Sequence, residues 1–255
     1  MAEVLKVTNL CKTYVINKRQ NNILKNVSFS IEEGEMVAVM GPSGSGKSTL
    51  LYSVSGMDRP TAGEVILAGK RISDMKERDL VDVRLNEMGF VFQQMHMLKN
   101  LNIADNILLP AYQAKTKGRS RKEINEYGRS LMHKLSISEI AENDITEVSG
   151  GQLQRACICR SMINHPNILF ADEPTGALNR GASDDVMREM NRLNQEGTTI
   201  MLVTHDMKVA SKCSRILYIV DGNIKGELSL GMLGDESEGK ARERKVANWL
   251  DDMGW

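Results

Sequence analysis

The segment Gly41–Thr49 has the residue types needed to hold the phosphate groups of a nucleotide. It reads Gly-Pro-Ser-Gly-Ser-Gly-Lys-Ser-Thr and fits the pattern Gly-x-x-x-x-Gly-Lys-Ser/Thr. The glycines allow the backbone to curl until successive N–H groups point at phosphate oxygens. A helix expected to begin near Lys47 would direct its positive end to the same place. This segment therefore predicts a binding site for a nucleoside triphosphate.

The side chains at the end of this segment are expected to have separate roles. We expect the Lys47 ammonium to reach the β- and γ-phosphates, and the Ser48 hydroxyl to be a ligand of Mg²⁺. Thr49 is placed to reach the α-phosphate. The predicted nucleotide contacts in this segment are Gly41, Ser43, Gly44, Ser45, Gly46, Lys47, Ser48 and Thr49.

Two adjacent acids, Asp172 and Glu173, follow the apolar run Ile168–Ala171. A parallel sheet would bring the end of that strand to the carboxyl edge at which such folds bind ligands, beside the phosphate segment. Asp172 then suits the Mg²⁺ site, directly or through water. Glu173 is the predicted base that polarises the water attacking the γ-phosphate, so the two acids indicate hydrolysis of the bound nucleoside triphosphate.

A second anion site is predicted at Ser149–Gln152. A serine followed by two glycines at the start of a predicted helix leaves backbone N–H groups that favour an anion. The phosphate segment already holds its own nucleotide. The second site is therefore explained if it serves a nucleotide that is bound mainly elsewhere.

The elements that must position these groups alternate short strands with turns over the first seventy residues. Met36–Met40 is a continuous apolar run, as expected of a strand buried on both faces of a parallel sheet. From Asp74 to Arg160 the pattern is mostly helical, with a capping box predicted at Ser120–Glu123 and a helix to about Leu135. Other strands are expected at Val4–Leu10, Val27–Ile31, Glu64–Leu67, Thr198–Val203, Ile216–Val220 and Asn223–Lys225, and another helix at Ala182–Gln195.

Composition and charge argue against several classes of protein. The 33 basic residues balance 33 acidic ones, which argues against a protein held to nucleic acid by bulk charge. No apolar run approaches the roughly 18 residues of a membrane span, and we expect no signal peptide. Cys11, Cys157, Cys159 and Cys213 are expected to be reduced thiols, the alternative being a redox or metal role for Cys157 and Cys159.

The segment Val148-Ser-Gly-Gly-Gln152, with the preceding motifs in the same order, resembles the signature of the ATP-binding-cassette (ABC) ATPases. The resemblance covers residues 1 to about 225. It implies an α/β fold with a P-loop NTPase core, an N-terminal antiparallel β subdomain and an inserted α-helical subdomain at about residues 95–160. It also implies that two copies meet head to tail. Each ATP would then lie between the phosphate segment of one copy and Ser149, Gly150, Gly151 and Gln152 of the other.

The resemblance assigns roles to three further residues. Tyr14 matches the aromatic residue that stacks on adenine, the alternative being a tyrosine at a strand edge. Gln93 matches the glutamine that senses Mg²⁺ and the attacking water and faces the membrane subunit. His205 matches the switch histidine that contacts the γ-phosphate. The predicted catalytic residues are Glu173, His205, Gln93 and Lys47, and the predicted Mg²⁺ ligands are Ser48, Gln93 and Asp172.

The chain departs from the family pattern at two positions. Asn179 stands where the family usually has Asp, so it keeps the shape and an acceptor oxygen but loses the charge. This loss is expected to soften contacts across the dimer at that loop. The signature opens with Val148 in place of Leu, which changes little physically.

The chain length, Asn106–Pro110 and Asp172–Asn179 resemble the macrolide-exporter and lipoprotein-release branch, which includes bacitracin-resistance exporters. This branch implies an ATPase subunit, peripheral to the cytoplasmic face of the cell membrane, that couples dimer closure to an integral-membrane permease. Export, antimicrobial-peptide resistance or extraction from the membrane would be the task. An importer cassette is the main alternative. Soluble cassettes acting on DNA or ribosomes carry long insertions or paired cassettes that this chain lacks, so no nucleic-acid partner is expected.

The cassette is expected to span residues 1–228, followed by a short charged tail, 229–255, that contains a helix. Trp249 and Trp255 are expected to pack this helix onto the cassette or a partner, with a membrane-surface anchor as the weaker alternative. The basic stretch Lys115–Lys122 is expected to be a solvated loop and helix start, although contact with anionic lipid headgroups is an alternative.

Overall fold

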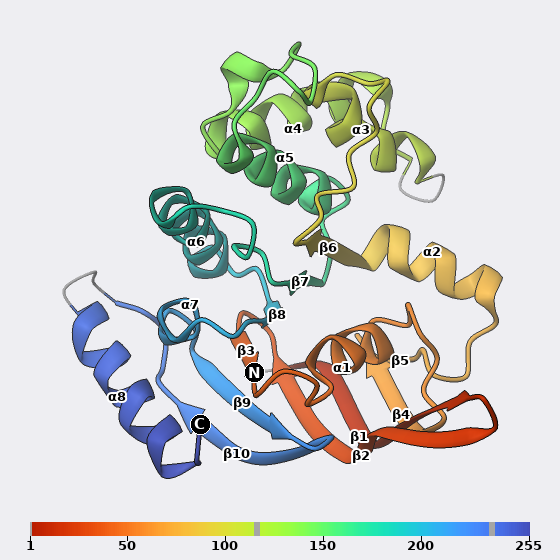
Figure 1. Cartoon of the computed structure of the whole chain (residues 1–255). Helices are drawn as coiled ribbons and strands as arrows, with labels where there is room; N and C mark the ends of the chain where they lie inside the picture. Colours follow the sequence, from red (N-terminus) through yellow and green to blue (C-terminus); the bar gives the residue numbers. More distant parts are fainter. Residues whose placement is uncertain (1, 115–117, 235–237) are drawn as a thin grey trace. The chain divides into compact units, whose positions relative to one another are not determined.

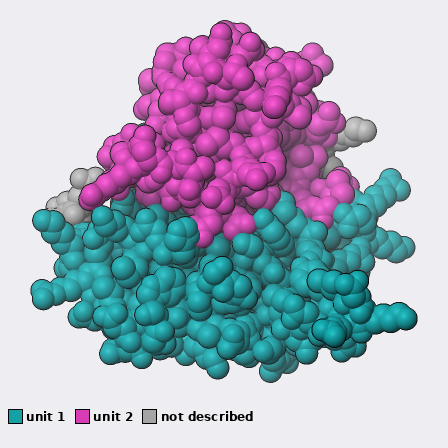
Figure 2. Space-filling model, viewed as in Figure 1, with its two compact units in different colours: residues 1–80, 191–255 teal, residues 81–190 magenta. Residues whose placement is uncertain are grey.

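The computed structural model describes residues 2–114, 118–234 and 238–255, and it divides the chain into two compact units (Figure 1). Unit 1 comprises residues 1–80 and 191–255, and unit 2 comprises residues 81–190 (Figure 2). Helices α2 (Glu77–Glu87) and α6 (Arg180–Gln195) have residues in both units. Residues 115–117 of the basic stretch lie outside the described residues.

Unit 1 contains the antiparallel sheet expected from the N-terminal sequence. Its strand order is β2-β1-β4-β5. The strands are β1 (Glu3–Ile16), β2 (Arg19–Glu32), β4 (Ala62–Leu67) and β5 (Lys70–Arg71). β1 and β2 extend well beyond the predicted ranges because their pairing continues to the hairpin end, where Ile16 is opposite Arg19. The predicted strands at Val4–Leu10 and Val27–Ile31 were therefore placed correctly but were too short.

A second set of strands in unit 1 surrounds β3 (Met36–Met40), all five residues of which are buried. β3 runs parallel to β8 (Ile200–Val203) and to β9 (Arg215–Val220), and β10 (Asn223–Ser229) is antiparallel to β9. The structure thus confirms the buried parallel strand that the apolar run Met36–Met40 predicts. β8 begins at Ile200 rather than Thr198 because the Thr198 N–H donates to the Leu193 carbonyl in the preceding turn.

Three helices of unit 1 complete this part of the fold. They are α1 (Lys47–Val54), α7 (Met207–Ser211) and α8 (Gly239–Asp252). The ring of Tyr218 in β9 lies 6.0 Å from that of Trp249 and 5.9 Å from that of Trp255. Figure 1 shows α8 running beside β9 and β10. The two tryptophans therefore pack the tail against the cassette, in agreement with the sequence expectation.

Unit 2 combines a strand pair with a group of helices. β6 (Met88–Phe92) is parallel to β7 (Ile168–Asp172). The helices are α3 (Ile103–Gln113), α4 (Arg121–Lys134), the 3-10 helix η2 (Ser138–Ile140) and α5 (Gly150–Met162). β6 was absent from the prediction, because a five-residue apolar run inside a helical pattern does not distinguish strand from helix.

Helix α4 begins where its sequence predicts. The Ser120 hydroxyl accepts a hydrogen bond from the Glu123 N–H, and the Glu123 carboxylate accepts one from the Ser120 N–H, which together form the expected capping box. The preceding Arg119 donates to the Ile163 carbonyl and to Asn164. The described part of the basic stretch is thus a loop and a helix start.

All four cysteines are free thiols, as the sequence predicts. Burial raises the pKa of Cys157 to about 11 and that of Cys213 to about 12, and it also raises the pKa of Cys159. Such thiols stay protonated and act as small apolar groups in the core. None of the described helices combines the length and the hydrophobicity that crossing a membrane requires.

Candidate nucleotide-binding site

The phosphate loop, Gly41–Gly46, connects β3 to α1 in unit 1. Helix α1 begins at Lys47, and its N-cap residue is Gly46, which has a left-handed backbone with φ 102°. Glycine offers no side chain to cap the first-turn N–H groups of α1. The start of the helix therefore keeps the partial positive charge that favours a phosphate.

The Lys47 ammonium is turned back over the phosphate loop. It donates to the carbonyl of Gly41 at 2.7 Å and to the carbonyl of Pro42 at 2.9 Å. Beside it, the Ser45 hydroxyl oxygen is buried and has no hydrogen-bond partner among the described residues. A cation held within the loop and an orphaned buried hydroxyl are both groups that a phosphate anion would satisfy.

Close backbone packing fixes the loop to the turn between β9 and β10. The Gly222 N–H donates to the Ser45 carbonyl at 3.1 Å, and the Gly222 carbonyl accepts from the Lys25 N–H at 2.8 Å. A Cβ atom on Gly222 would lie 2.1 Å from the carbonyl oxygen of Ile23. This turn therefore requires glycine, and it ties the loop to β2.

Tyr14 lies on β1, and its hydroxyl is tied to the region around α1. The hydroxyl donates to Asp58 at 2.5 Å and also hydrogen-bonds with the Thr49 side chain. Burial, followed by the hydrogen bond and the charge of Asp58, raises the pKa of Tyr14. Burial alone would raise the pKa of Asp58, but hydrogen bonds from Lys12 and Tyr14 outweigh it and lower that pKa.

His205 follows β8 in unit 1 and is exposed. The next residue, Asp206, caps α7 by accepting a hydrogen bond from the Lys208 N–H at 2.7 Å. The Thr204 hydroxyl accepts one from the Asp206 N–H at 3.0 Å. The backbone on the C-terminal side of His205 is thus fixed by these two hydrogen bonds.

In unit 2, strand pairing brings Gln93 and the acids together. Phe92 is opposite Asp172 in the parallel pair β6–β7, so Gln93 and Glu173 leave the sheet at the same edge. A Cβ atom on Gly176 would lie 2.9 Å from Nε2 of Gln93, so the glutamine side chain packs over the turn that follows Glu173. Gln93 and the turn that carries Glu173 therefore lie side by side in unit 2.

Glu173 has an unusual backbone conformation. Its φ is +48°, a left-handed value that costs a residue other than glycine roughly 1–3 kcal/mol. The Glu173 carbonyl accepts a hydrogen bond from the Gly176 N–H at 3.0 Å, which closes the turn. Strain of this kind is concentrated at functional sites, where the surrounding structure holds it in place. The half-buried Glu173 is therefore a candidate functional residue on structural grounds as well.

The predicted second anion site is the N-terminus of α5. Ser149 is its N-cap, and its hydroxyl accepts from the Gln152 N–H at 3.3 Å. The Gln152 side chain accepts from both the N–H and the hydroxyl of Ser149, at 2.9 and 3.0 Å. Of the two glycines that follow Ser149, Gly150 is exposed and Gly151 is buried. Gln152 therefore holds Ser149 in position at the helix start.

The asparagine that departs from the family pattern caps the next helix of unit 2. Asn179 Oδ1 accepts a hydrogen bond from the Ala182 N–H at 3.0 Å at the start of α6. Asn and Asp are about equally good in this role, so the substitution keeps the turn. A Cβ atom on Gly150 would be 3.4 Å from Leu178, which places this turn beside the start of α5.

The predicted Mg²⁺ ligands provide a hydroxyl from Ser48, an amide from Gln93 and a carboxylate from Asp172. Oxygen donors of this kind suit Mg²⁺, which is usually held by one or two carboxylates, substrate phosphates and water. No cluster of three or more His, Cys, Asp or Glu side chains suited to a metal occurs among the described residues. Of the predicted ligands, Ser48 lies in α1 of unit 1, whereas Gln93 and Asp172 lie in unit 2.

Sequence reasoning missed Lys12 and Asp58. The Lys12 ammonium is buried and forms an ion pair with Asp58, whose other oxygen accepts from Tyr14. Neither residue belongs to a motif, and 46 positions separate them. Alternation along a strand would not reveal the contact either, because the pairing of β1 with β2 is irregular between Lys12 and Thr13.

Comparison with known proteins gives consistent results. The ABC transporter family matches residues 24–176. The uncharacterised ABC transporter ATP-binding protein YknY of Bacillus subtilis is 40% identical over 232 residues, which cover 89% of this chain and 100% of YknY. The bacitracin export ATP-binding protein BceA of Halalkalibacterium halodurans is 39% identical over 235 residues, covering 92% of this chain and 90% of BceA.

Solved structures agree with these relatives. Two dimeric structures of MJ0796, a bacterial ABC transporter cassette, match with a TM-score of 0.82, covering 90% of this chain and 100% of theirs. Their sequence identities are 35% and 36%. The first is a post-hydrolysis state bound to ADP and Pi.

Proposed function

Since this chain belongs to the ABC transporter family, whose ATP-binding domains hydrolyse ATP, we propose that two copies form a head-to-tail dimer on an integral-membrane permease. The observation that carries the proposal is the second anion site. The cap between Ser149 and Gln152 fixes the start of α5, and the next residue, Gly150, is exposed, so its N–H is placed to meet an anion apart from the phosphate loop. The dimeric structures of MJ0796 support a site completed by a second copy.

In this proposal each ATP contacts both copies. One copy provides Tyr14 for the adenine, the phosphate loop with Lys47 for the phosphates, and Thr49 for the α-phosphate. The other copy provides the start of α5, that is Ser149, Gly150, Gly151 and Gln152. The turned-back Lys47 ammonium would exchange its carbonyl partners for phosphate oxygens, because a cation gains more from an anion than from a dipole.

Hydrolysis is assigned to the acids and to His205. Glu173 polarises the attacking water, and its strained left-handed backbone supports this functional assignment. His205 donates a hydrogen bond to the γ-phosphate. Mg²⁺, held by Ser48, Asp172 and Gln93, would neutralise charge on the β- and γ-phosphates when bound.

Coupling to the permease is assigned to the surface around Gln93. Its position at the edge of β6, over the turn that carries Glu173, makes it sensitive to whether the site is closed. The closed dimer would pull on the permease, and release of phosphate would reopen it. The chain would therefore work as a peripheral subunit at the cytoplasmic face of the cell membrane.

Export of, or resistance to, an antimicrobial peptide is the task that we propose for the complete transporter. The similarity to a bacitracin export protein supports this assignment, as do the branch features Asn106–Pro110 and Asp172–Asn179. An ATPase subunit of an importer is the second candidate, because cassettes of both kinds share the phosphate loop and the signature. Specificity for the cargo would lie in the permease.

Expression of this chain with the permease encoded beside its gene tests the proposal. We expect this chain and the permease to co-purify in detergent. We also expect a sensitive host that expresses both proteins to tolerate a higher concentration of a bacitracin-type peptide. The Lys47→Ala variant of this chain should still co-purify with the permease but should not protect the host. A permease of ten membrane spans with a large external insert would favour the bacitracin type, and one of four spans the lipoprotein-release or macrolide type. Failure to co-purify, or cargo uptake in place of protection, would contradict the proposal.

A further inference from the structure

We infer that Lys12 and Asp58 are positioning residues that fix the ring of Tyr14 for stacking on the adenine base of ATP. The inference rests on the proposed function, in which Tyr14 is the base-stacking residue. It adds two residues that touch no nucleotide in that proposal. Their role would be to set where the base lies relative to the phosphate loop.

The two oxygens of the Asp58 carboxylate serve different donors. One accepts the hydrogen bond from the Tyr14 hydroxyl at 2.5 Å, and the other forms the ion pair with the Lys12 ammonium. Lys12 also donates to the Arg59 carbonyl at 2.6 Å. The tyrosine, the lysine and the carboxylate are thus connected in one network.

Lys12 fixes the ring in a second way. The pairing of β1 with β2 is irregular between Lys12 and Thr13, and across this irregularity the Lys12 ammonium lies 4.8 Å from the centroid of the Tyr14 ring. A cation at this distance attracts the electron-rich ring face. Because Lys12 is only 7% exposed, its charge needs Asp58 as a partner. An ammonium on one ring face leaves the opposite face for a base.

Asp58 comes from the segment that follows α1, the helix that begins at the phosphate loop. Its N–H donates to the Tyr52 carbonyl at 3.0 Å, at the end of that helix. The Thr49 side chain, near the start of the helix, hydrogen-bonds with the Tyr14 hydroxyl. The ring is therefore tied to both ends of α1. This arrangement sets the distance between a base on Tyr14 and phosphates at Lys47.

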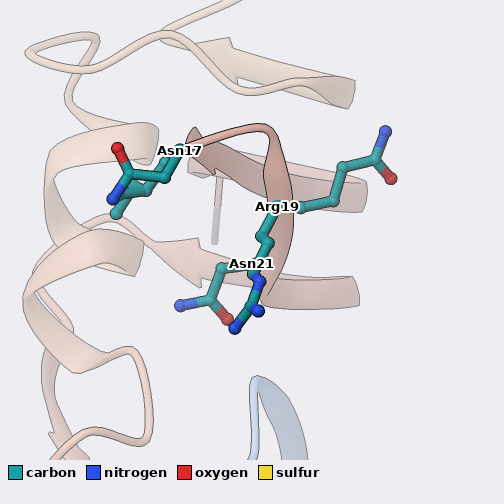
Figure 3. A pocket seen from close by; sticks show the side chains of 5 residues that line it. Asn17, Arg19 and Asn21 are labelled. Atoms are coloured by element: carbon teal, nitrogen blue, oxygen red, sulfur yellow. The ribbon is translucent and has the colours of Figure 1, made fainter.

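The residues that follow Tyr14 in β1 are more exposed than Lys12. Val15 and Ile16 are 68% and 61% exposed. The hairpin that follows surrounds an open hollow of about 630 Å³, lined by Ile16, Asn17, Arg19, Gln20 and Asn21. Figure 3 shows the side chains of Asn17 and Asn21 pointing away from the ribbon of this hairpin. The contacts with Lys12, Asp58 and Thr49 are therefore the ones through which we infer that the Tyr14 ring is held.

Binding of MgATP and of tripolyphosphate distinguishes an effect on the position of the base from general damage to the site. Tripolyphosphate carries the phosphates of ATP without the base. We would measure Kd for MgATP and for magnesium tripolyphosphate by calorimetry with the full-length chain and the variants Asp58→Asn, Lys12→Met and Tyr14→Ala. Asp74→Asn, which changes an exposed acid in an ion pair with Arg71, is the matched control.

We expect each of Asp58→Asn and Lys12→Met to weaken MgATP binding about tenfold, as loss of one base–aromatic stack would, and to leave tripolyphosphate within about twofold of the parent. Asp58→Asn should add little in a Tyr14→Ala background, because both changes remove the same contact. Equal weakening of both ligands, or unchanged MgATP binding by either variant, would overturn the inference. If Tyr14→Ala itself leaves MgATP binding unchanged, the proposed stacking fails, and the inference fails with it.

Discussion

The carbonyl oxygen of Ile219 in β9 lies where a side chain on Gly41 would begin. A Cβ atom on Gly41 would approach that oxygen to 2.1 Å and the Ser45 hydroxyl to 2.7 Å. Both distances are far below van der Waals contact, and the first involves backbone that cannot rotate away. The phosphate loop is therefore built directly against β9, and its first glycine is required by packing.

This contact predicts a large effect of Gly41→Ala. The loop would have to leave β9, so we expect MgATP affinity to fall more than tenfold and the melting temperature to fall by several degrees. Gly44→Ala is the matched control, because Gly44 has φ +79° but open space within 4 Å, so only its backbone conformation opposes a side chain. Calorimetry and thermal melting check both. A Gly41→Ala protein that binds MgATP better than Gly44→Ala would contradict this account.

Lys47→Ala tests the assignment of the phosphate site. Removing the ammonium that lies over the phosphate loop should abolish nucleotide binding or lower kcat/KM for ATP roughly a hundredfold or more, because the phosphates lose a charge-assisted hydrogen-bond donor. Steady-state ATPase assays provide the measurement. Lys25→Ala, on the exposed face of β2, should hydrolyse ATP at the parental rate. Normal turnover by Lys47→Ala would mean that the site lies elsewhere.

Arg242 anchors the C-terminal helix. Arg242 is 7% exposed, and its guanidinium donates to five backbone carbonyls, those of Ser211, Cys213, Leu230, Gly231 and Met232. Arg242→Met would leave these acceptors without their donor, so we expect the free energy of unfolding to fall by about 3 kcal/mol.

The same change should alter tryptophan fluorescence. Trp249 and Trp255 pack against Tyr218, so release of α8 would expose them and shift their emission to the red. Denaturant titration followed by fluorescence checks both effects. The neighbouring Arg244→Met, which changes an exposed side chain of the same helix, should match the parent. An unchanged unfolding curve for Arg242→Met would show that the carbonyls do not depend on the guanidinium.

Labelling of thiols should distinguish Cys11 from the three buried cysteines, Cys157, Cys159 and Cys213. At pH 8 the buried thiols are almost entirely protonated, because burial raises their pKa to about 11 for Cys157 and about 12 for Cys213, and raises that of Cys159 too. Cys11 is partly exposed. Iodoacetamide followed by mass spectrometry should therefore add one group to the native chain and four after denaturation, and Cys11→Ser should remove the first. Rapid labelling of Cys157 or Cys159 in the native chain would contradict their placement in the core.

The parts of the fold that could be predicted from the sequence are those whose cues are adjacent in the chain. The strand Met36–Met40 is apolar throughout, and the glycine pattern of the phosphate loop fixes the start of α1 at Lys47. The capping box at Ser120 is likewise contained within four residues. By contrast, β6 has a short apolar run and becomes a strand because β7 pairs with it. Tertiary contact decides such cases.

The candidate site likewise has features that could be predicted from adjacent residues and features that could not. The order of motifs predicts Glu173, but a left-handed backbone is not expected for a glutamate, and only the folded turn reveals it. The role of Asn179 as a cap could be expected from its acceptor oxygen, whereas the softening of dimer contacts stays a prediction. The hydrogen bond from Tyr14 to Asp58 spans 44 positions and has no sequence signature. Contacts of this length arise only when β1 is placed beside α1.

The central claim is that ATP is shared between two copies of the chain. Glu173→Gln should keep ATP binding but lower turnover at least a hundredfold, because the amide cannot polarise the attacking water. In analytical ultracentrifugation with MgATP, this variant should sediment at twice the 28.4 kDa mass of one chain. With ADP, or with Ser149→Arg added, it should sediment as a monomer, since the second copy could no longer close on the nucleotide. A Glu173→Gln protein that binds MgATP and remains a monomer, or a dimer that Ser149→Arg leaves intact, would contradict the account.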